Sequence, residues 1–136
     1  MITDDTLSFT IPLEPVPASR ARSVAGRPGY YPERYDTWRK EAAIALERIT
    51  EDLPQLGDSP LEVWLEFVCK RPKEPTHPYP SKGDVDNLSK ATLDAITKTG
   101  LWDDDMQVVT SHGTKRYNRP GEAPHTKVVI RPLELE

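Results

Sequence analysis

Hydrophobic and polar residues alternate in two segments, and a period of two is typical of strands that bury one face. Leu7, Phe9 and Ile11 alternate with polar positions and predict a strand over about 6–13. Leu61 to Cys69 repeat the pattern and predict a strand over about 60–70. Two further strands are predicted over about 107–117 and 126–131. A turn of Asn, Arg, Pro and Gly at 118–121 marks the boundary between them.

Hydrophobic residues at spacings of three and four predict two helices between the strands. The first covers about 33–52, where Trp38, Ala42 and Leu46 share a face behind Pro32. The second covers about 87–98 and ends before Gly100; either Asp84 or Asp86 caps its start. The order β-α-β-α-β-β indicates one α+β domain over residues 1–136, with a mixed sheet of about four strands packed against two helices.

Composition narrows the possible chemistry. No apolar run approaches the roughly 18 residues of a membrane span, and the first five residues do not begin like a secretory leader. We therefore expect a soluble, cytoplasmic protein without a membrane partner. Cys69 is the single cysteine and the three histidines are scattered, so any metal is expected to bind oxygen ligands. No phosphate-binding Gly-rich loop ending in Gly-Lys-Ser/Thr occurs, which excludes that kind of nucleotide hydrolysis.

Two acidic groups flank the second predicted helix. Asp84 and Asp86 stand two residues apart, so in extended chain their carboxylates project the same way and suit Mg²⁺ or Mn²⁺. Lys90 follows Asp86 by one helical turn. The chain must reverse after Gly100, and we expect this return to bring Asp104 or Asp105 back to the first pair. Converging carboxylates repel one another unless a cation lies between them, so the pattern predicts a divalent metal site.

Each acidic group also has a simpler explanation when taken alone. Asp86 and Lys90 are compatible with a helix cap and an ordinary surface ion pair, and residues 103–105 with a solvated turn. The metal hypothesis depends on the two groups acting together.

A basic segment precedes the first helix, although the whole chain carries a net charge of -4. Residues 18–40 hold two acidic residues and six basic ones: Arg20, Arg22, Arg27, Arg34, Arg39 and Lys40. Tyrosines and Trp38 are interleaved with them, a combination suited to phosphate contacts and base stacking. Lys70, Arg71, Lys73 and Lys82 lead toward Asp84 and extend the same basic track. We predict DNA contacts at Arg20, Arg22, Arg27 and Lys82; a solvated loop is the alternative.

The combined motif resembles the RusA family of crossover junction endodeoxyribonucleases. The similarity is carried by Asp-Val-Asp-Asn-Leu-x-Lys at 84–90, Leu-Asp-Ala at 93–95, Gly-Leu-Trp at 100–102 and Asp-Asp-x-Gln-Val at 104–108. It is looser around Pro17, Arg20, Arg22 and the Tyr-Pro at 31–32.

The resemblance implies a Mg²⁺-dependent homodimer that resolves four-way (Holliday) junctions in recombination and repair by symmetric nicks in two strands. Asp84, Asp86 and Asp105 would bind the metal, and Lys90 would be the catalytic base or a charge stabiliser. The spacing to Gln107 selects Asp105 over Asp104. Two other hypotheses remain: a junction-binding protein that does not cut, expected if the three carboxylates are held apart, and a metal-dependent nuclease for flaps or single strands.

Overall fold

The computed structural model describes residues 5–21 and 29–134 of the 136-residue chain. Strand β1 (Leu7–Ile11) is followed by helix α1 (Glu33–Glu51), strand β2 (Leu61–Cys69) and helix α2 (Val85–Thr97). A short 3-10 helix, η1 (Asp105–Gln107), then leads into strands β3 (Val108–Tyr117) and β4 (His125–Pro132). This order confirms the predicted α+β fold. None of the helices in the described ranges is long and apolar enough to cross a membrane.

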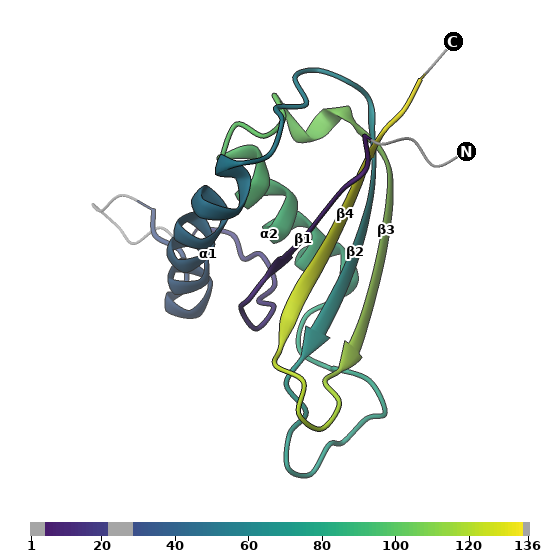
Figure 1. Ribbon diagram of the computed structural model, residues 1–136. Helices are drawn as coiled ribbons and strands as arrows, with labels where there is room; N and C mark the ends of the chain where they lie inside the picture. The colour runs from purple at the N-terminus through teal and green to yellow at the C-terminus, as the bar shows by residue number, and fades with distance from the viewer. Residues whose placement is uncertain (1–4, 22–28, 135–136) are drawn as a thin grey trace.

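The four strands form one mixed sheet in the order β1-β4-β2-β3. β4 runs antiparallel to β1 and to β2, whereas β3 runs parallel to β2. Parallel neighbours need a long crossover, and α2 provides it between β2 and β3. Figure 1 shows α1 and α2 together on one side of the sheet. We call this side of the molecule the helix side and the opposite surface of the sheet the open face.

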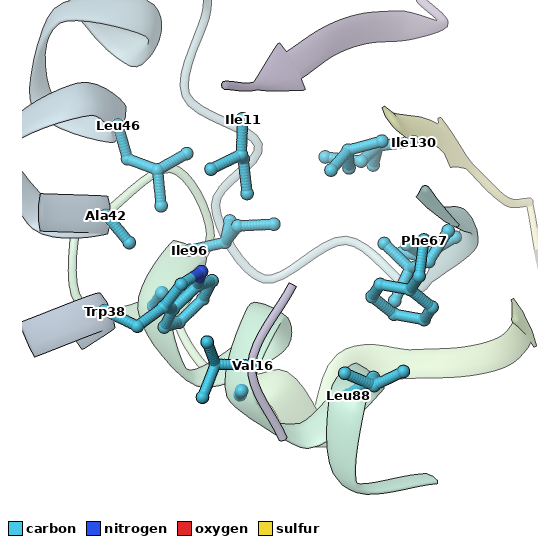
Figure 2. Packing of buried hydrophobic residues seen from close by; sticks show 14 of the residues in the cluster. Ile11, Val16, Trp38, Ala42, Leu46, Phe67, Leu88, Ile96 and Ile130 are labelled. Atoms are coloured by element: carbon cyan, nitrogen blue, oxygen red, sulfur yellow. The ribbon is translucent and has the colours of Figure 1, made fainter. Parts of the chain in front are cut away.

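The core lies between the sheet and the two helices. β2 contributes its centre, because Leu61, Val63, Leu65 and Phe67 are at most 2% exposed. In Figure 2, Trp38, Ala42 and Leu46 of α1 point toward the same interior as Ile96 of α2 and Ile11 of β1. The spacing of three and four in each helix therefore does mark the buried face. Glu62, Trp64 and Glu66 of β2 alternate with the core residues and lie on the open face.

Two glycines allow the N-terminal end of α2 to lie close to its neighbours. A Cβ atom on Gly113 of β3 would come within 2.5 Å of Cγ1 of Val85, so α2 and β3 meet there without an intervening side chain. Gly83 has a φ of +85°, a conformation that favours glycine, and a Cβ there would lie 2.8 Å from Cγ of Pro17. Both contacts fix the position of the chain immediately before and after Asp84.

Candidate active site

Asp84 caps α2, which settles the choice between the two predicted caps. Its side-chain oxygen accepts a hydrogen bond from the backbone N–H of Asn87 at 2.8 Å. The helix consequently begins at Val85, two residues before the predicted start, and Asp86 lies in its first turn. Both carboxylates are exposed, and no basic side chain of the described ranges lies within 4 Å of either.

The second acidic group is held by a capping box around η1. Asp104 caps this short helix and accepts a hydrogen bond from the N–H of Met106, while the side-chain oxygen of Gln107 accepts from the N–H groups of Asp103 and Asp104. The Gln107 amide donates to the carbonyl oxygens of Gly57 and Ser59. Asp104 thus caps η1 as Asp84 caps α2, and Asp105 lies in the first turn of η1.

The two acidic groups flank α2 in the order that the sequence predicted. Asp84 and Asp86 lie at the start of the helix, and Asp105 follows in η1. The described residues contain no group of three or more Asp, Glu, His or Cys side chains placed to hold a metal ion.

Backbone hydrogen bonds anchor the turn after α2. The N–H groups of Leu56 and Asp103 donate to the carbonyl oxygens of Leu101 and Gly57. The chain then runs back along β3, and Gly113 of this strand lies against Val85 at the start of α2.

Asp105 lies near the middle of α2. Desolvation raises the pKa of the Asp105 carboxyl, the neighbouring carboxylates of Asp104 and Asp94 raise it further, and Lys90 lowers it. Asp86, Lys90 and Asp94 are spaced by four residues and therefore form a stripe along one side of the helix. The stripe extends from the Asp86 end of α2 toward Asp105.

A polar cavity of about 600 Å³ opens beside this stripe. It is lined by Asn87, Lys90 and Asp94 of α2, by Tyr31 and Tyr35 from the entry to α1, and by residues 18–21. The backbone N–H of Ala18 donates to the carbonyl oxygen of Asn87 at 2.9 Å and fixes residues 18–21 against α2.

The cavity brings together some of the predicted site residues. Arg20 and Lys90 both line it, although they are 70 positions apart in the sequence. Lys82 is exposed just before α2 and borders a different cavity. Arg22 and Arg27 lie outside the described residues.

Asn87, Asp94 and Tyr35 were not among the predicted site residues. Burial raises the pKa of the Tyr35 hydroxyl, and the Asp94 carboxylate raises it further. Asp94 was detectable from the sequence, because it follows Lys90 by the same four residues that separate Lys90 from Asp86. Tyr35 was hidden by its place in the buried face of α1.

The side chains at the start of α2 have the right chemistry for a hard divalent cation. Mg²⁺ commonly binds through one or two carboxylates and completes its shell with water and substrate phosphate oxygens. Asp84 and Asp86 supply two such carboxylates, and both are exposed to solvent. A divalent cation held by these carboxylates, with water and a substrate phosphate completing its shell, therefore fits this end of the helix.

The fold and this surface define an α+β domain with an exposed acidic site beside an arginine and a lysine. The sequence model of the family described as "Endodeoxyribonuclease RusA" matches residues 12–131, which include every predicted site residue. The chain belongs to the RusA family.

Two curated relatives support this assignment over shorter stretches. The "Crossover junction endodeoxyribonuclease rusA" of Enterobacteria phage 82 is 45% identical over 51 residues, which cover 38% of this chain and 42% of that protein. The protein of the same name from Escherichia coli strain K12 is 45% identical over 49 residues, or 36% of this chain and 41% of that protein. The chain thus aligns with about two-fifths of the length of each relative.

Proposed function

We propose that this chain is a Mg²⁺- or Mn²⁺-dependent endonuclease that resolves four-way DNA junctions by paired, symmetric nicks. The observation that carries the proposal is the surface at the start of α2. Asp84, Asp86 and Lys90 have no ion-pair partner within the described residues, and Lys90 lines one cavity with Arg20. Membership of the RusA family supports it, and the curated relatives carry names of junction endonucleases.

Each side chain has a role that follows from its charge and position. Asp84 and Asp86 would hold the cation, which supplies a Lewis acid and an activated water when bound. Lys90 lies one turn further along α2, where its ammonium group stabilises negative charge that develops on the reacting phosphate. Arg20 faces the same cavity and binds a neighbouring phosphate of the DNA backbone. Asp94 lines the same cavity, and its carboxylate pairs with Lys98 at 3.2 Å.

The active form that we propose is a two-fold homodimer. A four-way junction presents two equivalent strands, and a two-fold dimer offers one site to each. A second reason is that the described residues of one chain hold no group of three carboxylates placed around a metal ion, and a symmetric partner can supply the missing ligand. In this arrangement Asp105 of the partner subunit completes the carboxylate set at the start of α2.

The direct test is cleavage of a synthetic four-way junction in the presence of Mg²⁺ and in the presence of a chelator. We expect two symmetric nicks with Mg²⁺ only, and much slower cleavage of a flap, a single strand or a duplex of equal length. Asp86→Asn should abolish the nicks and leave junction binding intact. Binding by the wild type without any cleavage rejects the enzyme, and equal cleavage of flaps or single strands rejects selectivity for junctions.

A complementation experiment tests the shared site separately. Asp86→Asn and Asp105→Asn chains carrying different tags are co-expressed, and the mixed dimer is purified through both tags. If each site combines the two acidic groups of different subunits, the mixed dimer retains one site with all its carboxylates and nicks one strand. If each site belongs to one chain, both sites are damaged and the mixed dimer stays as inactive as either parent.

A non-cleaving junction-binding protein is the second candidate. It is favoured by the finding that the described residues of one chain contain no group of three acidic side chains placed to hold a metal ion. The same assays separate the candidates: a binder shifts the mobility of the junction at any Mg²⁺ concentration, and the mixed dimer never produces a nick.

A further inference from the structure

A second cavity on the helix side, of about 210 Å³, has no role in the chemistry described above. It is lined at the end of β2 by Cys69 and Lys70, at the start of α1 by Arg34, and in the loop before α2 by Ser81 and Lys82. These residues come from three separate parts of the sequence. The fold therefore gathers three cationic side chains around one opening.

The positive charge of this cavity is poorly compensated. Glu14 is the one acidic residue in its lining, and its carboxylate lies 3.9 Å from the guanidinium of Arg34, at the outer limit of an ion pair. Within residues 5–21 and 29–134, neither Lys70 nor Lys82 has a carboxylate within 4 Å. Cations that are left without a partner around a concave surface attract an anion.

The cavity lies next to the proposed cleavage site. Lys82 precedes Asp84 by two residues, and the intervening Gly83 is fixed by Pro17 and by Lys115, whose ammonium group donates to the Gly83 carbonyl oxygen at 3.1 Å. The segment 14–21 borders both cavities, because its first residues line this one and its last residues line the cavity that contains Lys90. The two cavities are therefore linked along this segment, with Arg34, Lys70 and Lys82 around one and Arg20 and Lys90 in the other.

We propose that this second cavity binds a backbone phosphate of the DNA strand beside the one that is cut, with Arg34, Lys70 and Lys82 as its ligands. The inference rests on the proposed nuclease function. Arg34 offers a planar fork of N–H donors, and the two lysines add point charges, a combination that matches a phosphodiester. A contact of this kind sets the register of the strand over Asp84 and Asp86 and contributes affinity, whereas it does not take part in the bond cleavage.

Junction binding measured as a function of salt concentration tests the assignment. Lys70→Gln should weaken binding roughly three- to tenfold near physiological salt and lower the slope of log K against log salt by about 0.9, the amount expected for one phosphate contact. Arg34→Gln combined with Lys70→Gln should lower it by about twice as much. The matched control is Lys127→Gln, which removes the same charge from an exposed lysine on the open face and should leave the slope unchanged.

Two failures are distinguishable in this experiment. If the wild type neither binds nor cuts the junction, the proposed function is wrong and the inference falls with it. If the wild type binds and cuts but Lys70→Gln behaves like Lys127→Gln, the function stands and the phosphate site is wrong.

Inorganic phosphate tests the other source of the same ligand chemistry. At the phosphate concentration of the DNA, inorganic phosphate should not displace the junction from the wild type. Displacement by inorganic phosphate at that concentration would assign the cavity to a free anion and overturn the DNA contact.

Discussion

The open face of the sheet and the start of α2 differ in how their charges are paired. On the open face, Arg131 contacts Glu62 at 2.5 Å, and Arg116 pairs with Glu122 at 2.7 Å and with Glu66 at 3.6 Å. Elsewhere on the helix side, Asp36 pairs with Lys40 at 2.9 Å and Asp94 pairs with Lys98 at 3.2 Å. Asp84, Asp86 and Lys90 have no such partner within the described ranges. Ion pairs that are satisfied inside the molecule leave little charge for a ligand, whereas unpaired charges are free to bind one.

Aromatic side chains take part in the charge pairing on the open face. Trp64 on the open face is stacked on the His112 ring with centroids 5.2 Å apart, and the guanidinium of Arg131 lies over it at 5.5 Å. The Glu62 carboxylate accepts from both His112 and Arg131, and these bonds hold its pKa below the usual range, the bond from His112 most strongly. This network stabilises the sheet. Asp84, Asp86 and Lys90 at the start of α2 have no such contacts within the described residues, and the proposed function requires their charges to be available to a divalent ion and to DNA phosphate.

The difference between paired and unpaired charges is tested most strongly by removing one charge of each kind, Arg116 on the open face and Lys90 on α2. Lys90→Gln should lower the rate of junction cleavage by about 100-fold, because charge on the phosphate loses its stabiliser. The same change should leave the free energy of unfolding within about 0.5 kcal/mol of the wild type. Arg116→Gln should do the reverse, with a lower free energy of unfolding and normal cleavage. Urea unfolding and single-turnover cleavage measure both quantities, and a Lys90→Gln protein as destabilised as Arg116→Gln would contradict the division.

Asp84 allows the structural and functional parts of one side chain to be separated. Asp84→Asn keeps an oxygen that accepts the N–H of Asn87 and should fold as well as the wild type, whereas Asp84→Ala loses the cap and about 1 kcal/mol of stability. Both variants lose the negative charge and should cut junctions far more slowly. Thermal unfolding of the pair, followed by circular dichroism, checks the first expectation. Equal stability of the two variants would mean that the cap contributes nothing.

Acid should weaken the open face in a defined range of pH. The guanidinium of Arg116 lowers the pKa of Glu122 from 4.5 to about 2. A carboxyl with a depressed pKa stabilises the fold fully above its unfolded value, and this contribution is lost as the pH falls from about 4.5 toward 2. The free energy of unfolding should therefore drop more steeply over this range in the wild type than in Glu122→Gln. Parallel curves for the two proteins would contradict the assignment.

The smallest expected effect comes from Asp105. Since its pKa is raised in the folded chain, the ionised carboxylate opposes folding at neutral pH. Asp105→Asn should accordingly raise the melting temperature slightly in a buffer that contains a chelator, and Mg²⁺ should not stabilise this variant as it does the wild type. A lower melting temperature for the variant in chelator would show that the carboxylate has a structural role.

Local patterns in the sequence predicted the fold well, because each element is specified by its own residues. The alternation in β2 and the spacing of Trp38, Ala42 and Leu46 in α1 mark buried faces that the structure confirms. These local patterns could not predict the strand order, because the pairing of β1 with β4 joins residues at opposite ends of the chain.

The candidate site was predicted less completely. The sequence identified Asp84, Asp86 and Lys90 because they share one short stretch around the start of a helix. It did not show where Asp105 lies, because that depends on bonds from Gln107 and Asp103 to residues 57–59, almost 50 positions away. Long-range hydrogen bonds of this kind leave no periodic signal.

The most direct test of the account is a calorimetric titration of Mn²⁺ into the purified protein. The account predicts saturable heat for the wild type, strongly reduced heat for Asp86→Asn, and unchanged heat for Lys127→Gln on the open face. If the wild type releases or absorbs no heat, or if Asp86→Asn binds Mn²⁺ as the wild type does, the unpaired carboxylates at the start of α2 are not a metal site.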